Sequence, residues 1–126
     1  MSKRILRFPP GVLALLRASR TLGIRAGTDH RFTGIWFVMV GERVFVRPWN
    51  DDAAGWRQAF RVDPHGAISI AKREIEVRAR PVRGERLVDA IDGAYAQKYD
   101  SKGSQKWVRG FATPKRRKTI VELLPG

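Results

Sequence analysis

The chain has 126 residues, 43% of them hydrophobic, which fits one domain able to build its own core. The lack of cysteine excludes disulfides, thiolate metal sites and a cysteine nucleophile, and the two histidines, His30 and His65, have no metal-ligand spacing. The 25 Lys and Arg against 12 Asp and Glu give a formal net charge of +13, which attracts polyanions but does not imply specificity.

Residues 1–10 are basic and end in two prolines, so they are predicted to form an arm ahead of a single domain that spans residues 11–126. No apolar run is long enough to cross a bilayer, and the N-terminus lacks the apolar core of a signal peptide. We therefore expect a cytoplasmic protein without a membrane partner.

Residues 11–23 are predicted to form a short helix, with Leu13 and Leu16 on its apolar stripe and Gly23 as its stop. From Ile24 the apolar period changes to two, which predicts a short strand over residues 24–27.

The segment 35–40, IWFVMV, predicts a strand that is apolar on both faces. Such a strand is covered on both sides, by a core and by a helix or partner chain. Gly41-Glu42 predicts a type II′ turn, so residues 43–47 return antiparallel to the first strand. Pro48 then ends the second strand, because proline cannot donate to a ladder.

The next residues predict a short helix capped by Asn50, Asp51 or Asp52, with Trp56 and Phe60 on one face. A turn over residues 63–66 leads to a second hairpin, whose strands are AISIA and EIEVRARPV.

Residues 85–98 show apolar side chains at helical spacing and predict a surface helix, with Asp89 and Asp92 on its other side. YDSKGSQK is predicted to be a polar loop. Thr113-Pro114 is typical of the start of a helical turn, after which TIVELL forms a last strand. About six short strands in one small domain favour a barrel or a sandwich.

No catalytic signature of hydrolases is present, since the sequence has no phosphate loop, no H-E-x-x-H and no G-x-S-x-G. The first hairpin and the residues after it instead form a basic, aromatic cluster, in which an arginine could hold a phosphate and the indoles could flank a planar ring. The same residue types are equally typical of a core in which arginines stack on tryptophans. The members of this cluster are Trp36, Phe45, Arg47, Trp49, Trp56 and Arg57.

The run KRRK, residues 115–118, is of the nucleic-acid or localisation type, and is also typical of a solvated helical turn. If it binds nucleic acid, Trp107 and Phe111 are the aromatic side chains available for stacking on single strands.

The segments GIWFVMVGERVFVRP, GWRQAFRVDP and IEVRARPV, followed by AYAQKY at residues 94–99, resemble a known family. The sequence is similar to small split β-barrel proteins related to pyridoxamine phosphate oxidases and deazaflavin-dependent nitroreductases. Within this superfamily it most resembles the uncharacterised bacterial domain-of-unknown-function 2255 family. The resemblance implies an α+β fold that is mainly β, a six-stranded antiparallel split β-barrel with a few helices.

The resemblance further implies a homodimer with flavin mononucleotide (FMN) or a deazaflavin bound in a groove between barrel and partner. In this interpretation Arg47 and Arg57 bind the phosphate, Thr33 hydrogen-bonds the ligand, and Trp36 or Trp56 forms a wall for the ring.

Our leading hypothesis is therefore a cofactor-binding split barrel, an oxidoreductase that acts by hydride transfer. A cofactor would supply the reactive atom that this chain, without nucleophile or metal site, lacks. Two alternatives remain: a basic barrel that binds nucleic acid, and a split barrel that binds no cofactor. Acidic residues after Arg47 are a departure from cofactor-binding relatives and favour the last of these.

Overall fold

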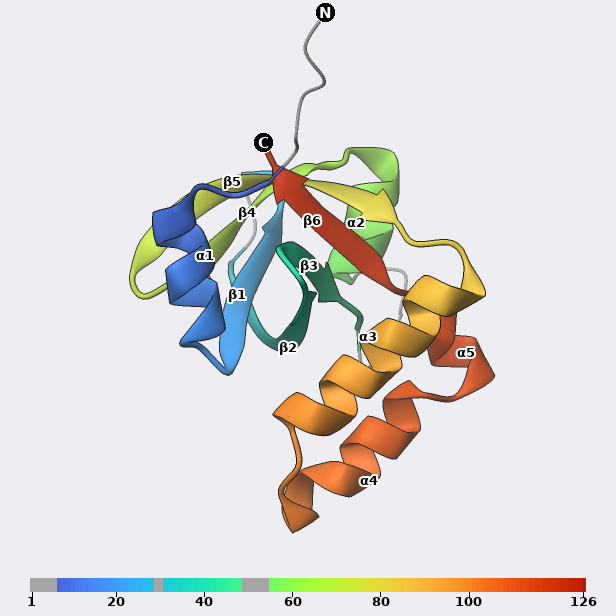
Figure 1. The fold of residues 1–126 in the computed structure, drawn as a ribbon. Helices are drawn as coiled ribbons and strands as arrows, with labels where there is room; N and C mark the ends of the chain where they lie inside the picture. Colours follow the sequence, from blue (N-terminus) through green and yellow to red (C-terminus); the bar gives the residue numbers. More distant parts are fainter. Residues whose placement is uncertain (1–6, 29–30, 49–54) are drawn as a thin grey trace, which may run out of the picture.

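Six antiparallel strands close into a barrel of order β1-β2-β3-β6-β5-β4 in the computed structural model, which describes residues 7–28, 31–48 and 55–126 (Figure 1). The strands are β1 (Thr21–Ala26), β2 (Thr33–Val40), β3 (Arg43–Val46), β4 (His65–Ile70), β5 (Arg73–Pro81) and β6 (Val121–Pro125). The predicted six-stranded antiparallel split barrel with a few helices is therefore confirmed.

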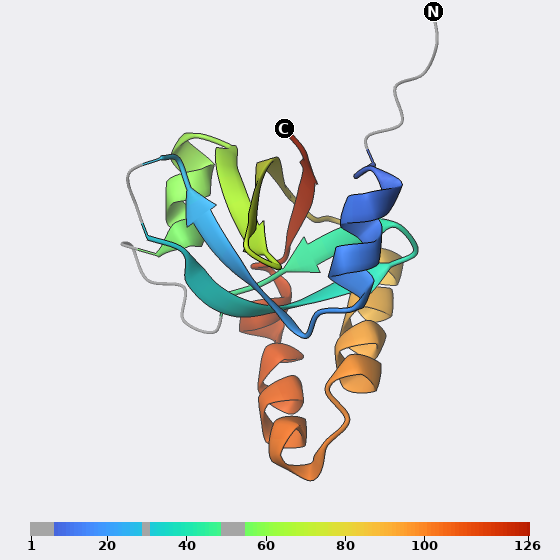
Figure 2. The same ribbon diagram turned by 90° about the vertical axis from the view of Figure 1, so that its left-hand side faces the viewer.

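Helices cover the barrel on several sides. They are α1 (Pro10–Arg17), α2 (Trp56–Val62), α3 (Glu85–Lys98), α4 (Lys102–Phe111) and α5 (Pro114–Arg117). Helix α1 lies beside the barrel, whereas α3 and α4 extend together from the barrel on another side (Figures 1 and 2). Within the described part of the chain, none of the helices is long and apolar enough to cross a membrane.

The barrel interior is filled by the inward side chains of the strands and by the apolar face of α1. On β1, Leu22, Ile24 and Ala26 are buried and alternate with more exposed residues, as expected for one wet and one dry face. Helix α1 adds Leu13 and Leu16 to the same cluster. Phe8, within the predicted basic arm, is buried in this cluster as well; the boundary between arm and domain stays a prediction.

Strand β2 is apolar on both faces, as predicted from its sequence. Its residues Ile35, Phe37 and Met39 pack in the barrel core. Its residues Trp36, Val38 and Val40 pack in a second cluster with side chains of α3, among them Ile91 and Tyr95. The second cover is thus a helix of the same chain, so β2 does not require a partner chain; the homodimer stays a prediction.

The turn between β2 and β3 is of the predicted kind. Gly41 has φ +63°, in the left-handed region that a type II′ turn requires at its first central residue. Val40 then pairs with Arg43 and Phe37 with Val46.

The structure corrects the predicted end of the first helix, the predicted cap of α2 and the prediction for the segment YDSKGSQK. The first helix ends at Arg17, and Gly23 lies inside β1 opposite Gly34, because the alternation of Leu22 and Ile24 continues a strand. Helix α2 is preceded by Gly55, without a side-chain cap; the expected caps, residues 50–52, lie outside the described residues.

The segment YDSKGSQK is also not a loop throughout, because α4 begins within it at Lys102. The side chain of Ser101 accepts a hydrogen bond from the backbone N–H of Ser104 at 3.2 Å and so caps the helix.

The turn between β4 and β5 gives a first testable prediction. Ala71 and Lys72 have φ +49° and +64°, a conformation that costs residues with a β-carbon about 1–2 kcal/mol. We expect Lys72→Gly to raise the free energy of unfolding by about 0.5–1 kcal/mol, since the greater freedom of glycine in the unfolded chain offsets part of the gain. Urea titration measures this, with Lys72→Ala as the control that leaves stability unchanged; an equal gain from both variants would contradict it.

Candidate functional site

The segment AYAQKY places three polar side chains at the C-terminal end of α3 against the backbone of β2. Tyr95, Lys98 and Tyr99 are three and four residues apart and so lie on one face of the helix. The β1–β2 ladder ends at the pair Thr21 and Trp36, so the backbone of Phe37 lacks a partner on β1. The helix supplies that partner.

The Tyr99 hydroxyl occupies the place where the ladder stops. It accepts a hydrogen bond from the N–H of Phe37 at 3.1 Å, and it lies within donating distance of the carbonyl oxygens of Phe37 (2.9 Å) and Arg20. A hydroxyl has one proton, so it donates to one of these carbonyls at a time. Burial raises the pKa of Tyr99 to about 12, and its ring stacks on Trp36 at 4.0 Å between centroids.

Lys98 shares the carbonyl of Phe37 with Tyr99. Its Nζ donates to that oxygen at 2.9 Å and lies 3.4 Å from the centre of the Phe37 ring. Burial, and then the positive charge of Arg20, lower the pKa of Lys98 to about 8. With Lys98 serving the Phe37 carbonyl, the Tyr99 proton is available to the Arg20 carbonyl.

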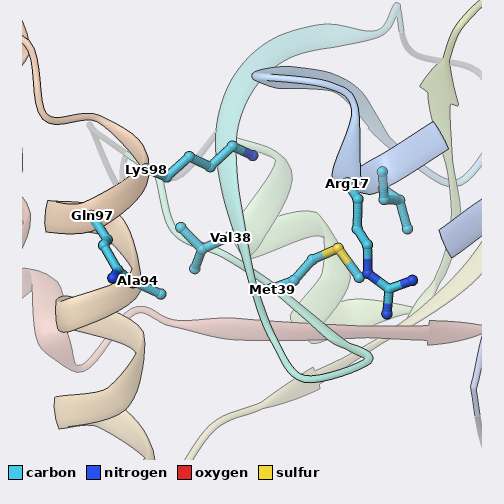
Figure 3. Close-up of a pocket in the computed structure, with 7 residues that line it drawn as sticks. Arg17, Val38, Met39, Ala94, Gln97 and Lys98 are labelled. Atoms are coloured by element: carbon cyan, nitrogen blue, oxygen red, sulfur yellow. The ribbon is translucent and has the colours of Figure 1, made fainter. Parts of the chain in front are cut away.

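A pocket of about 400 Å³ opens beside Lys98, between α1, β2 and α3 (Figure 3). Arg17 enters it from α1 and Lys98 approaches from α3, while Val38 and Met39 of β2 lie between them. The full lining is Leu16, Arg17, Val38, Met39, Ala94, Gln97 and Lys98. Its walls are thus mostly aliphatic, with cations at the edges.

The cations at and near this pocket lack an acidic partner within the part of the chain that the structure describes. Among the described residues, no carboxylate forms an ion pair with Arg17, Arg20 or Lys98. Lys98 is half-buried and its charge is repelled by that of Arg20, so an anion bound beside it would be favoured.

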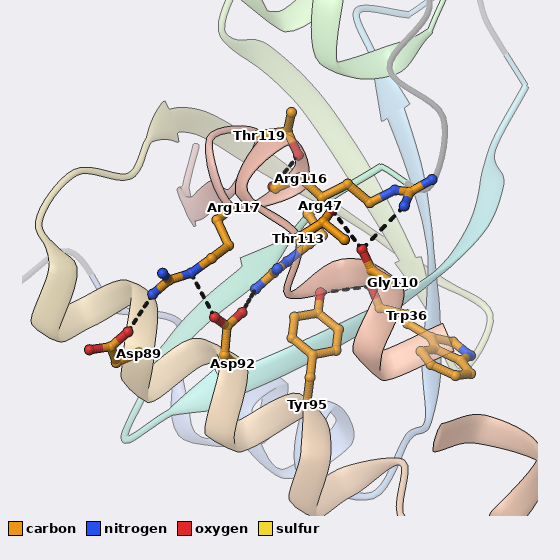
Figure 4. A network of polar contacts seen from close by, with 10 residues as sticks. All are labelled: Trp36, Arg47, Asp89, Asp92, Tyr95, Gly110, Thr113, Arg116, Arg117 and Thr119. Atoms are coloured by element: carbon orange, nitrogen blue, oxygen red, sulfur yellow. Dashed lines mark hydrogen bonds and ion pairs between the residues drawn. The ribbon is translucent and has the colours of Figure 1, made fainter. Parts of the chain in front are cut away.

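Arg47, the cation directly after β3, is balanced within the chain. Its Nη2 lies 2.7 Å from Oδ1 of Asp92, its side chain is 0% exposed, and it lies over the ring of Tyr95 at 4.9 Å. Asp92 also lies 2.9 Å from Nε of Arg117, which in turn pairs with Asp89 (Figure 4). Asp92 therefore links the end of β3, α3 and α5. The prediction that Asp92 lies on the solvent side of its helix was wrong.

The structure distributes the five predicted cofactor residues over separate places. Trp36 and Arg47 lie on the α3 side of the barrel, in and beside the second cluster. Trp56 and Arg57 lie on α2, where the Trp56 ring meets Phe60 edge to face at 6.2 Å and packs against the barrel core. Thr33 is exposed at the start of β2. The two indoles are in different clusters, and the predicted ligand roles stay predictions.

The residue set at the pocket was missed from the sequence. Lys98 and Arg17 belong to different helices, and only the position of Lys98 between two tyrosines of one helical face signalled that it points inward. A second residue, Glu122, was missed inside the apolar run of β6. It is buried and binds Arg43 at 2.8 Å and Arg80 at 2.7 Å; burial raises its pKa, but the two arginines outweigh this and hold the pKa below its usual value.

The part of the chain that the structure describes contains no group of three His, Cys, Asp or Glu side chains able to hold a metal ion.

The fold defines the class of protein, a split barrel with helices over one face of β2. A "putative pyridoxamine 5'-phosphate oxidase" from Listeria innocua has a similar structure, with a TM-score of 0.59 and 15% identity over 92% of this chain and 90% of that one. The conserved hypothetical protein Rv2991 from Mycobacterium tuberculosis is also similar, with a TM-score of 0.56 and 12% identity over 100% of this chain and 85% of that one.

The sequence assigns the family. Residues 18–123 match the uncharacterized proteins conserved in bacteria known as DUF2255, and the chain belongs to this family. No curated protein matches the sequence.

The Arg47–Asp92 pair gives a second prediction. Asp92→Asn leaves the buried guanidinium without its carboxylate, so we expect a loss of about 3 kcal/mol in the free energy of unfolding. Asp89→Asn is the matched control on the same helix; Asp89 is 71% exposed, so its loss should stay under about 1 kcal/mol. Equal losses in urea titrations would show that burial does not govern this network.

The shared carbonyl of Phe37 gives a third prediction. We expect Tyr99→Phe to cost about 2 kcal/mol, since the buried N–H of Phe37 loses its acceptor. In a double-mutant cycle with Lys98→Met, the combined loss should exceed the sum of the single losses, because either side chain alone can serve the Phe37 carbonyl. Strictly additive losses would refute this sharing.

Proposed function

We propose that this protein binds a flavin-type cofactor, FMN or a deazaflavin, in the pocket between α1, β2 and α3. One observation carries the proposal: Arg17 and Lys98 line a pocket of about 400 Å³, the positive charge of Arg20 acts on Lys98, and no described carboxylate forms an ion pair with any of the three. A phosphate-bearing ligand supplies the missing negative charge.

The lining suits both parts of such a molecule. Its volume falls within the roughly 300–1,000 Å³ of small-molecule sites. The aliphatic walls, Leu16, Val38 and Met39, suit the faces of a planar ring, and the amide of Gln97 can donate and accept hydrogen bonds at the ring edge. The cations suit the phosphate.

A bound flavin or deazaflavin would supply hydride-transfer chemistry, which makes an oxidoreductase the proposed class of enzyme. The residues of this chain would neutralise the phosphate, exclude water from one face of the ring and orient it against β2. The similar fold of the protein described as a "putative pyridoxamine 5'-phosphate oxidase" supports this proposal.

A titration with FMN, followed by flavin fluorescence, tests the proposal, with a deazaflavin titration in parallel. We expect binding by the unmodified protein and about tenfold weaker binding by Arg17→Met and Lys98→Met, since each removes a charge-assisted contact. Arg57→Met is the control, because Arg57 lies on α2 and not at the pocket. Failure of the unmodified protein to bind either cofactor would refute the proposal. Weaker binding by Arg57→Met alone would instead favour a site at α2.

The pH dependence of affinity gives a sharper readout at the same site. Lys98, with its pKa of about 8, loses its charge in the free protein as pH rises from 7 to 9, whereas the phosphate is already fully ionised above its second pKa of about 6. Affinity for FMN should therefore fall over this range. Lys98→Arg keeps the charge and should remove the pH dependence; the same slope in both proteins would exclude Lys98 from the site.

A further inference from the structure

Helix α4 carries a second group of cations, separate from the pocket. Lys102, Lys106 and Arg109 are four and three residues apart, so they form one stripe along the helix, and all three are exposed. The sequence of α4 contains no acidic residue. Nowhere in the described ranges does a carboxylate form an ion pair with any of the three.

An aromatic ring lies beside this stripe. Trp107 is 40% exposed, which is unusual for so large an apolar side chain, and Nζ of Lys106 lies 5.2 Å from the centre of its ring. A partly exposed indole next to cations combines a stacking surface with phosphate-binding groups.

The helix is held in place from its other side. Val108 is buried in the cluster that α3 forms with β2, and Ser101 caps the N-terminus of α4. Helix α4 lies beside α3 and, with it, extends away from the barrel strands in both views (Figures 1 and 2). The cationic stripe is therefore presented to solvent on a fixed support.

We propose that the α4 surface, defined by Lys102, Lys106, Trp107 and Arg109, binds single-stranded nucleic acid. The cations would contact successive phosphates and Trp107 would stack on an unpaired base. A duplex offers no free base face to the indole. A membrane surface fits less well, since a helix lying in a bilayer interface needs a broad apolar face, and the apolar Val108 of α4 is turned into the protein.

This inference does not depend on the proposed cofactor, and a labelled oligonucleotide tests it. We expect the anisotropy of fluorescein-labelled dT20 at 50 mM salt to report binding that weakens at least tenfold by 200 mM salt. Trp107→Ala should weaken binding about tenfold, and Trp107→Phe, which keeps a ring, should weaken it less.

Charge reversal supplies the matched control. Lys102→Glu/Lys106→Glu changes the net charge by the same amount as Lys72→Glu/Arg78→Glu on the β4–β5 hairpin, which lies away from α4 (Figure 1). Only the α4 pair should abolish binding at 50 mM salt. Equal effects of both pairs, an unchanged affinity of Trp107→Ala, or no binding of dT20 to the unmodified protein would overturn the proposal. It would also be overturned by Trp107-dependent binding to phosphatidylserine vesicles without binding to dT20.

Discussion

The architecture depends on one constraint, that β2 is apolar on both faces while its neighbour β1 ends halfway along it. The inner face is satisfied by closing the barrel, but the outer face and the backbone of Phe37 are not. Helix α3 resolves both demands, because its apolar side chains cover the outer face and Tyr99 and Lys98 bind the backbone. A buried N–H without an acceptor costs about 1–3 kcal/mol, so the position of α3 is set by hydrogen bonds as well as by apolar contact.

The same docking fixes the charges around the helix. Asp92 approaches the end of β3 and neutralises Arg47, which allows a guanidinium to be fully buried there. Lys98 lines the pocket together with Arg17, the charge of Arg20 acts on it, and no described carboxylate neutralises it. Helix α3 therefore neutralises Arg47, which the sequence analysis had singled out. It also places Lys98 at a pocket where no described carboxylate neutralises it, which the sequence analysis did not predict.

The sequence predicted those features that repeat locally. Alternation along β2, the Gly41 turn and the apolar spacing of α3 each follow from neighbours a few residues apart, and each was confirmed. The pairing of Arg47 with Asp92 joins residues 45 positions apart, and a charged pair leaves no periodic trace in either segment. Helix α4 was missed because polar residues surround the buried Val108, through which it packs.

The net charge of +13 can be interpreted only when the positions of the charged side chains in the fold are known. Four arginines are paired with two carboxylates that lie between structural elements and so contribute to the fold: Arg43 and Arg80 with Glu122, and Arg47 and Arg117 with Asp92. Other cations lie at the concave, aliphatic pocket and on the exposed surface of α4, where no carboxylate of the described residues pairs with them. A concave apolar site can enclose a small anion. An exposed helix with a row of cations and an aromatic ring suits an extended polyanion instead. The two surfaces therefore favour ligands of different size, although their charge is the same.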